Sequence, residues 1–476
     1  MTYVSTRGQA PVLGFADAML KGLAQDGGLY VPAHWPALDG PRIAALFGLS
    51  YEDAATEIMV PFIGDAMAVA EFRTLVQDAY SGFRHRVRCP LVQIGSNSFL
   101  LELFHGPTLA FKDVAMQFIG RLFATWLSHK GERLTIVGAT SGDTGSSAIE
   151  AFRGQDSVDV FIMYPDGRVS DVQRRQMTTP QEANVHALAV EGDFDDCQRL
   201  LKSLFNDSEF RDEARLGAVN SINWARVLAQ VVYYFTAAVA LGAPDRKVSF
   251  VVPTGNFGDV YAGYVARRMG LPIDRLVIAT NQNDILDRTL RTGSYRMSDV
   301  KPSISPSMDI QVSSNFERVL FDGCGRDASQ VRHLMAALAT DRGFDLPPGA
   351  AAFLRREFAS GRASEAETAE TIRAVQSETG RTLCPHTAVA VKVARDMARA
   401  GGQVRESDGD SPVVILATAH AAKFPDAVEA ACGVRPPLPT ELADIFDRPE
   451  RMTRVANDPA AIKSIIMERT AACRRS

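Results

Sequence analysis

The sequence is poor in several residue types, and each shortage excludes a class of protein. Of its 476 residues only nine are lysines, against 42 arginines, and the 51 cationic residues are outnumbered by 56 acidic ones. The formal net charge of −5 leaves no basic field of the kind that holds nucleic acid or an anionic membrane. We therefore expect neither nucleic acid nor a membrane among the partners.

Cysteines are also few. The six cysteines are widely spaced and form no C-x-x-C pair, which argues against a disulfide framework and a zinc knuckle, so we expect no metal site. The first residues lack the apolar core of a secretory signal, and reduced thiols in the cytoplasm are expected.

Long hydrophobic runs are missing as well. The longest apolar stretch covers the 17 residues 227–243 and is interrupted by Gln230 and Thr236. A membrane-spanning helix needs about 20 apolar residues, so this stretch predicts a helix buried in a large core. With 46% hydrophobic and 22% charged residues, the composition is that of a folded globular protein.

The chain does contain a regular alternation of strand and helix patterns. Residues 1–95 are predicted to be mostly helical, with apolar residues at helical spacing over 17–23 and 43–58. From residue 98 onward, short β-rich runs alternate with helical segments, which is typical of βαβ units and mostly parallel sheets. The predicted strands are 98–104, 134–137, 158–163, 185–190, 248–252, 276–280 and 413–417.

These patterns predict an α/β protein in three parts. The expected divisions are an N-terminal, mostly helical portion at 1–95, a smaller α/β domain at 96–240 and a larger α/β domain at 241–476. The stretch 325–400 is expected to be helical, with Ser364 and Glu367 forming a capping box and Gly380 ending that helix. A polar, glycine-rich connector is expected at 401–411.

One of the nine lysines stands directly before an amphipathic helix. Lys112 follows Phe111 in HGPTLAFKD, and apolar residues recur at helical spacing from Val114 onward. Burial there would lower the pKa of the amine, and a neutral amine can attack a carbonyl carbon to form a Schiff base. The alternative is a lysine at a helix start that is ion-paired to Asp113.

Two turns between a strand and a helix have the composition of anion sites. In PTGNFGD the glycines at 255 and 258 allow close backbone approach, and the N–H groups of the following helix suit a phosphate. GATSGDTGSSA has neither the Walker nor the G-x-G-x-x-G spacing, but Ser141, Thr144 and Ser146 add hydroxyl donors. Either turn could instead be an ordinary connection with helix-capping residues.

A fourth segment, ATAHAAKF, follows the last predicted strand. It would place Thr418 at the carboxyl end of that strand, where ligands bind in open α/β sheets, whereas His420 alone indicates an ordinary loop histidine. Together the four segments supply a covalent anchor, a phosphate cradle and a hydroxyl for a ring nitrogen. A phosphorylated aldehyde cofactor needs these three features.

Six segments in this order resemble threonine synthases of the longer bacterial and fungal type. They are HGPTLAFKD, GATSGDTGSSA, NSINWAR, PTGNFGD, ATNQNDIL and SPSMDIQVSSNFER, and the likeness extends from about residue 26 to about 420. The resemblance implies the fold-type II pyridoxal-phosphate (PLP) architecture, in which two α/β domains clasp the cofactor behind an N-terminal helical portion.

The resemblance also implies roles for individual residues. Lys112 would carry PLP as a Schiff base, and Thr418 would contact the pyridine nitrogen. The cofactor phosphate would be lined by Gly255, Asn256, Phe257, Gly258 and Asp259. The substrate would be bound by Ser141, Asp143 and Thr144 at its carboxylate, with Asn223 in a further family motif and Arg226 at the substrate phosphate.

The implied reaction converts O-phospho-L-homoserine and water to L-threonine and phosphate. Lys112 would remove the α proton and then a β proton, phosphate would leave from Cγ, and water would add at Cβ. Other fold-type II lyases, such as a serine or threonine dehydratase or an amino acid phospho-lyase, remain alternatives, as does a non-catalytic PLP-binding relative. A kinase is disfavoured by the missing Walker lysine, and the sequence leaves monomer and homodimer open.

Overall fold

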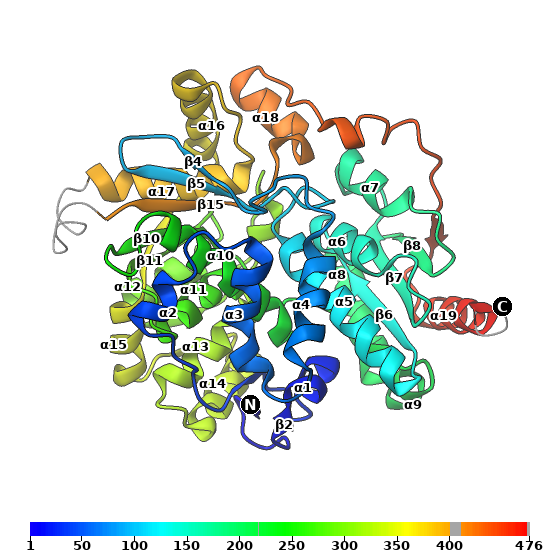
Figure 1. The fold of residues 1–476 in the computed structure, drawn as a ribbon. Coiled ribbons are helices and arrows are strands. Elements are labelled where there is room, and N and C mark those ends of the chain that lie inside the picture. Colours follow the sequence, from blue (N-terminus) through cyan, green and yellow to red (C-terminus); the bar gives the residue numbers. More distant parts are fainter. Residues whose placement is uncertain (218, 400–410, 474–476) are drawn as a thin grey trace.

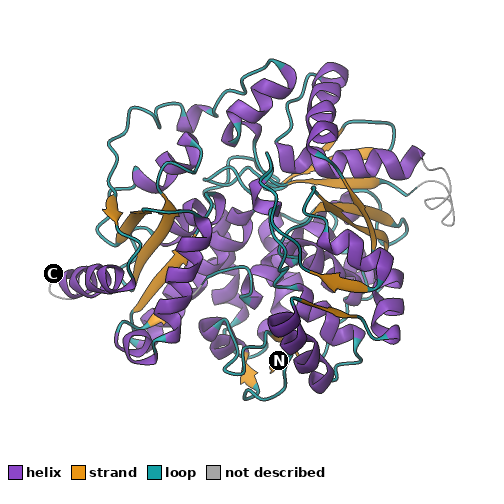
Figure 2. Ribbon diagram, turned by 180° about the vertical axis from the view of Figure 1, so that it is seen from behind, coloured by secondary structure: helices purple, strands orange, loops and turns teal. Residues whose placement is uncertain are grey.

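Two sheets dominate the computed structural model, which describes residues 1–217, 219–399 and 411–473, with side chains described up to residue 470 (Figure 1). The predicted connector at 401–411 lies, except for its last residue, outside the described residues. The larger sheet has the strand order β14-β11-β10-β15-β5-β4, and the smaller one has the order β16-β8-β7-β6-β9. Figure 2 shows the strands of the two sheets on opposite sides of the molecule, with helices between them.

The strands of the two sheets are mostly parallel, as the alternating pattern predicts. Only β4 runs antiparallel to its neighbour in these two sheets, as far as the described residues show. The larger sheet contains β4 (Leu91–Gln93), β5 (Ser98–Glu102), β10 (Val248–Pro253), β11 (Ile273–Thr280), β14 (Ala359–Arg362) and β15 (Val413–Ala417). The smaller sheet contains β6 (Leu134–Ala139), β7 (Val158–Pro165), β8 (Val185–Val190), β9 (Leu216–Gly217) and β16 (Thr453–Val455). All seven predicted strands are confirmed.

The helices pack on the faces of these sheets and between them. They are α1 (Phe15–Lys21), α2 (Gly40–Ala44), α3 (Tyr51–Ile63), α4 (Val69–Tyr80), α5 (Lys112–Lys130), α6 (Asp143–Phe152), α7 (Asp171–Thr178), α8 (Phe194–Asn206), α9 (Ser208–Glu213), α10 (Trp224–Ala240), α11 (Gly258–Arg268), α12 (Ile285–Thr292), α13 (Phe316–Gly323), α14 (Ala328–Asp341), α15 (Pro348–Glu357), α16 (Glu365–Thr379), α17 (Pro385–Arg399), α18 (Pro425–Cys432) and α19 (Pro459–Cys473). The described residues also form the short 3-10 helices η1 (Pro306–Met308), η2 (Ala421–Lys423) and η3 (Thr440–Leu442).

Two of these helices confirm predictions made from local signals. The apolar stretch at 227–243 forms most of α10, which is buried along nearly its whole length between α3, α5 and α11. The hydroxyl of Ser364 accepts a hydrogen bond from the Glu367 amide, and α16 ends at Gly380 in the left-handed conformation. Within the part of the chain that the structure describes, no helix is long and apolar enough to cross a lipid bilayer.

The N-terminal portion differs from the helical prediction in two respects. A three-stranded sheet forms there from β1 (Thr2–Ser5), β2 (Leu13–Gly14) and β3 (Tyr30–Pro32). Elsewhere in the chain, β12 (Ser294–Arg296) and β13 (Gly343–Asp345) form a separate two-stranded antiparallel sheet. The helix predicted over 43–58 is split into α2 and α3. The split occurs because Gly48 adopts a φ of +78° and Ser50 then caps α3 by accepting a hydrogen bond from the Asp53 amide.

Two strands lie in a different sheet from the one that the predicted divisions at residues 96 and 241 give them. Strand β5 falls in the predicted smaller domain, yet it joins the larger sheet beside β15, and β4, which precedes residue 96, pairs with β5. Near the C-terminus, β16 joins the smaller sheet beside β8. The chain therefore enters the larger sheet first, builds most of the smaller one, returns to the larger one and ends at the smaller one.

We expect Gly120→Ala to destabilise the fold, because α5 and α6 approach closely at this glycine. An added Cβ would lie 2.4 Å from the carbonyl oxygen of Ala151. Overpacking of this kind costs about 1–3 kcal/mol, which exceeds the gain of about 1 kcal/mol in helix propensity. The thermal unfolding midpoint of the variant should therefore fall.

The matched control is Gly349→Ala in α15, where the described residues place no heavy atom within 4 Å of an added Cβ. This variant should unfold at or slightly above the wild-type temperature. Equal midpoints for the two variants would contradict the close-approach argument.

Candidate active site

A short backbone pairing brings the two ends of the candidate site together. The amide of Phe111 donates to the carbonyl of Thr418 at 2.8 Å, and the amide of His420 donates to the carbonyl of Leu109 at 3.0 Å. Residues 109–111 thus run antiparallel to residues 418–420, directly after β15. Because Lys112 is the first residue of α5, this pairing sets it beside Thr418 at the carboxyl end of a central strand.

The Lys112 amine lies in a buried, charged environment. Its Nζ is 3.3 Å from Oδ2 of Asp143, and it sits 5.0 Å from the centre of the Phe111 ring. Burial lowers the pKa of Lys112, the charge of Asp143 opposes this, and the charges of Lys423 and Arg226 lower it further. The result is an amine that gives up its proton more readily than an exposed lysine does.

The alternative pairing of Lys112 with its neighbour Asp113 is not what the structure contains. Asp113 instead accepts hydrogen bonds from the amide of Thr108 at 2.7 Å and from its hydroxyl at 2.6 Å. The Thr108 hydroxyl also contacts the hydroxyl of Ser147 at 2.9 Å. Asp113 therefore fixes the loop before α5 and leaves Lys112 to Asp143.

The predicted substrate loop lies between β6 and α6. It is held by Thr140, whose hydroxyl accepts hydrogen bonds from the amides of Gly142 and Gly145, each at 2.9 Å. Gly142 has a φ of +138°, which favours glycine and turns the chain into α6 at Asp143. Ser141 and Thr144 lie on either side of Asp143 in the sequence and are partly exposed.

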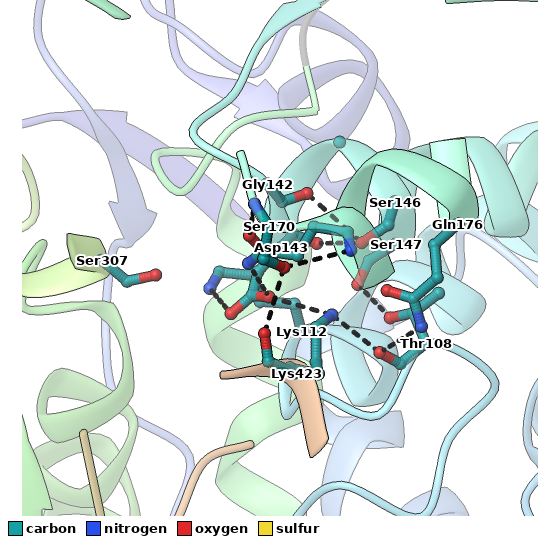
Figure 3. A network of polar contacts seen from close by, with 12 residues as sticks. Thr108, Lys112, Gly142, Asp143, Ser146, Ser147, Ser170, Gln176, Ser307 and Lys423 are labelled. Atoms are coloured by element: carbon teal, nitrogen blue, oxygen red, sulfur yellow. Dashed lines mark hydrogen bonds and ion pairs between the residues drawn. The ribbon is translucent and has the colours of Figure 1, made fainter. Parts of the chain in front are cut away.

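Asp143 is the centre of a polar network (Figure 3). Its Oδ1 accepts from Nζ of Lys423 at 2.9 Å and from Nε2 of Gln173 at 2.8 Å, while its Oδ2 faces Lys112. Burial alone would raise the pKa of Asp143, but the positive charges of Lys423 and Lys112 outweigh it and hold the pKa far below its usual range. Asp143 is therefore ionised.

Three residues of this site were missed by the sequence analysis: Gln173, Lys423 and His386. For Lys423 a signal existed, because lysines are scarce and this one stands in the segment that carries Thr418. His386, at the start of α17, accepts a hydrogen bond at Nε2 from the Ser307 amide at 3.2 Å. Burial lowers the pKa of His386 to about 4, which makes it neutral at physiological pH. No local pattern identifies Gln173.

The turn between β10 and α11 forms a cradle of backbone amides. Phe257 adopts a φ of +63°, and α11 begins at Gly258. For the amides of residues 255–258, the described residues supply no acceptor. The segment 305–316 holds this turn, since the hydroxyl of Ser313 donates to the Gly255 carbonyl at 2.6 Å and the Asn315 amide donates to the Asn256 carbonyl at 3.0 Å.

The space at this cradle suits a phosphate. A Cβ added to Gly255 would lie 2.7 Å from the Ser307 carbonyl oxygen, so only glycine fits there. Unpaired amides at the N-terminus of an 11-residue helix favour an anion. A phosphate is therefore suited to the backbone amides that the resemblance assigns to it, those of Gly255, Asn256, Phe257 and Gly258.

The side chain of Asp259, predicted to line the same cradle, is used elsewhere. Its Oδ1 accepts hydrogen bonds from the hydroxyls of Tyr233 and Tyr234, the latter at 3.0 Å. Burial raises the pKa of Asp259 to about 7, although both hydroxyls act in the opposite direction. Only the backbone amide of Asp259 is left for an anion in the cradle.

The two predicted residues of NSINWAR have different surroundings. Asn223 caps α10 by accepting from the Ala225 amide at 3.0 Å, and its side-chain amide donates to the Met19 carbonyl at 2.8 Å. Arg226 is 5% exposed, donates to the Val219 carbonyl at 3.3 Å, and is paired with no acidic side chain among the described residues. Burial lowers the pKa of Arg226 to about 10. Asn223 thus supports the helix, whereas Arg226 is a buried cation without a counter-ion.

The residues present fit a phosphorylated aldehyde cofactor. A buried amine with a lowered pKa, a cradle of unpaired amides and a threonine hydroxyl lie at the carboxyl ends of β5, β10 and β15, with Thr418 itself only 5% exposed. The described residues contain no group of three His, Cys, Asp or Glu side chains that could hold a metal ion.

Comparison with known proteins agrees with this geometry. A family model described as "Threonine synthase N terminus" matches residues 2–80, one described as "Pyridoxal-phosphate dependent enzyme" matches 86–363, and "Threonine synthase, C-terminal" matches 387–466. Threonine synthase of Pseudomonas aeruginosa is 50% identical over 469 residues, which cover 98% of each chain. This chain belongs to the threonine synthase family.

Solved structures of the family match the whole fold. PLP-bound threonine synthase from Brucella melitensis has a TM-score of 0.94 and 56% identity, with 98% of this chain and 99% of that chain covered. Yeast threonine synthase has a TM-score of 0.92 and 40% identity, with 99% of both chains covered. The expectations of a fold-type II architecture and of a PLP-dependent enzyme are confirmed.

We expect Asp259 to make the stability of the protein depend on pH. Its pKa in the fold is about 7, against 3.8 ordinarily, so the folded state binds this proton more tightly than the unfolded chain does. The contribution of Asp259 to the stability of the fold is fully present below about pH 4 and is lost as the pH rises through 7. Relative to Asp259→Asn, the wild type should lose about 4 kcal/mol over this range.

The measurement is the thermal unfolding midpoint at pH 5 and pH 8 for the wild type and for Asp259→Asn. The exposed Asp65 provides a control, because Asp65→Asn should keep the wild-type pH dependence. If Asp259→Asn keeps the full wild-type pH dependence, the shifted pKa is wrong.

Proposed function

We propose that this enzyme converts O-phospho-L-homoserine and water to L-threonine and inorganic phosphate. The proposal is supported by a buried amine in the same fold as two groups that suit anions. The amide cradle at 255–258 suits the cofactor phosphate, and the buried guanidinium of Arg226, which pairs with no acidic side chain among the described residues, suits a second phosphate. The charge of Arg226 acts on the pKa of Lys112, so the second anion would be held near the reacting atoms.

The residues that would hold PLP are those that the resemblance implies. Lys112 would bind its aldehyde as a Schiff base, the amides of the cradle would bind its phosphate, and the hydroxyl of Thr418 would contact its ring nitrogen. The bound cofactor supplies an electron sink for the negative charge that develops on the substrate carbons. A neutral hydroxyl imposes no charge on the ring nitrogen, so proton placement by Lys112 matters more.

Lys112 would then carry out the proton transfers. Its lowered pKa lets the free amine remove the proton at Cα, release that proton again, and then remove the proton at Cβ. The hydroxyls of Ser141 and Thr144 would orient the amino acid by its carboxylate, whereas the ionised Asp143 of the same loop would hold Lys112 and Lys423 rather than bind a second carboxylate. Arg226 would bind the phosphate that leaves from Cγ. The Lys112 side chain is only 10% exposed, so the surrounding protein excludes most water from these steps.

The alternatives within the same fold differ in what they require. A serine or threonine dehydratase would share Lys112 and the amide cradle but would have no use for a buried arginine at a second phosphate. An amino acid phospho-lyase would use that arginine but would not return water to Cβ. We further propose a cytoplasmic location, where the thiol pool keeps the cysteines reduced, which cell fractionation would check.

The reaction is tested by incubating the PLP-loaded protein with O-phospho-L-homoserine and measuring phosphate and threonine together. We expect equal amounts of both. Lys112→Ala should lose nearly all turnover, and it should also lose the borohydride-reducible adduct that mass spectrometry locates on this residue in the wild type. Phosphate without threonine would favour a phospho-lyase, and a fully active Lys112→Ala would contradict the assignment of the lysine.

Arg226→Gln tests the second phosphate site. Removing a buried cation from a phosphate costs about 3 kcal/mol, so kcat/KM for O-phospho-L-homoserine should fall roughly 100-fold. Inhibition by inorganic phosphate should weaken in parallel, while the affinity for PLP stays close to wild type. The partly exposed Arg211, which is paired with Asp212, offers a control, since Arg211→Gln should change neither value.

If Arg226→Gln instead loses PLP affinity and keeps its KM for the substrate, Arg226 belongs to the cofactor phosphate. That outcome would contradict its assignment to the substrate.

A further inference from the structure

Asp143 is shared between two buried lysines, and only one of them has a role in the proposed reaction. Lys423 on η2 is fully buried, and its ammonium donates to Oδ1 of Asp143 at 2.9 Å and to the Thr108 carbonyl at 2.7 Å. Lys112 faces the other oxygen, Oδ2, at 3.3 Å. Figure 3 shows the two lysines reaching the carboxylate from different elements.

We propose that Lys423 is a positioning residue for the reaction, whose ammonium group holds the Asp143 carboxylate and thereby leaves the Lys112 amine free to take up and release protons. This inference rests on the proposed function, because that function assigns the proton transfers to Lys112.

The charge balance around Asp143 supports this role. A buried carboxylate needs a cation, and a carboxylate paired only with Lys112 would keep that amine protonated. Lys423 supplies the needed charge from the other side and at the shorter distance. Gln173 donates to the same oxygen at 2.8 Å, so Oδ1 carries the two shorter contacts and Oδ2 only the longer one.

The surroundings of Lys423 hold it in this position. Its own carbonyl accepts from the Ser170 hydroxyl at 3.1 Å, and η2 is capped by the His420 ring, which accepts from the Ala422 amide. The Thr108 carbonyl that receives its ammonium also receives Nε2 of Gln176 at 3.1 Å. Lys423 is thus fixed by contacts that involve none of the proposed substrate-binding groups except Asp143.

The other charged groups near Lys112 cannot replace Lys423. Arg226 on α10 raises the local positive potential but is not paired with Asp143. His386 on α17 is neutral at physiological pH, since burial lowers its pKa to about 4. Asp113 on α5 is occupied by Thr108. Among the described residues, the cations paired with Asp143 are Lys112 and Lys423.

The experiment measures the titration of Lys112 in the full-length chain without cofactor. Competitive acetylation from pH 6 to 11, with the Lys112 peptide quantified by mass spectrometry, gives the midpoint, and circular dichroism checks that each variant is folded. Lys423→Met should raise the midpoint by about one to two pH units, because the nearby cation is lost and Asp143 pairs with Lys112 alone. In the PLP-loaded enzyme, the acid limb of the pH profile of kcat/KM should also move to higher pH.

Two controls separate this effect from a general loss of structure. Lys423→Arg keeps the charge and should leave the Lys112 midpoint near the wild-type value. Lys463→Met removes a lysine that is paired with Asp207 outside this site and should have no effect on the midpoint. A folded Lys423→Met with the wild-type midpoint would overturn the proposal and leave Lys423 a purely structural residue.

Asp143→Asn keeps the proposal testable if Lys423→Met does not fold. This variant should lower the Lys112 midpoint, because the amine loses its anion but keeps the neighbouring cation, and an unchanged midpoint would overturn the proposal. If both variants fold, Lys423→Met should shift the Lys112 midpoint less in the Asp143→Asn background than in the wild type. An equal shift would show that Lys423 does not act through Asp143. These titrations involve no turnover, so a failure of the proposed reaction would be recognised separately in the release assay.

Discussion

The active site depends on the short backbone pairing between residues 109–111 and 418–420. These two segments precede α5 and follow β15, and two hydrogen bonds join them. The pairing brings Lys112 and Thr418 to the same strand end, although more than 300 residues separate them in the chain. The proposed anchor for the aldehyde and the proposed contact for the ring nitrogen serve one cofactor only if they stay close together, and this pairing holds their backbones side by side.

The electrostatics of the site follow from its excess of positive charge. Lys112, Lys423 and Arg226 are all buried, Asp143 contacts the two lysines, and the charge of Arg226 acts on Lys112. Uncompensated buried cations are costly, so such an arrangement persists in proteins mainly where an anion binds. Two phosphate groups would supply that charge. Burial and crowding of the cations also lower the pKa of Lys112, so the arrangement that attracts the anions prepares the base as well.

The sequence was sufficient to predict an element wherever the signal came from residues close together in the chain. Strand and helix alternation predicted the larger elements, and Lys112, Gly255 and Thr418 were singled out as candidates because each stands at a junction between strand and helix patterns. Side-chain directions could not be predicted in this way. Asp259 lies beside the glycine turn, but its carboxylate bonds to Tyr233 and Tyr234 on another helix. The same limit explains why the helix-capping role of Asn223 was not predicted. Its side chain bonds to the start of its own helix and to the distant Met19 carbonyl.

The division of the chain between the sheets was also beyond local signals, because the order of strands is set by packing between distant segments. Its consequence for the site is that the substrate loop follows β6 of the smaller sheet, whereas the segment with Thr418 and Lys423 follows β15 of the larger one. The ion pair of Asp143 with Lys423 therefore joins the two sheets as well as balancing charge. Moving one sheet away from the other would expose a buried carboxylate and a buried ammonium, which is costly. The alignment of the two sheets and the charge state of the base are thus coupled through one contact.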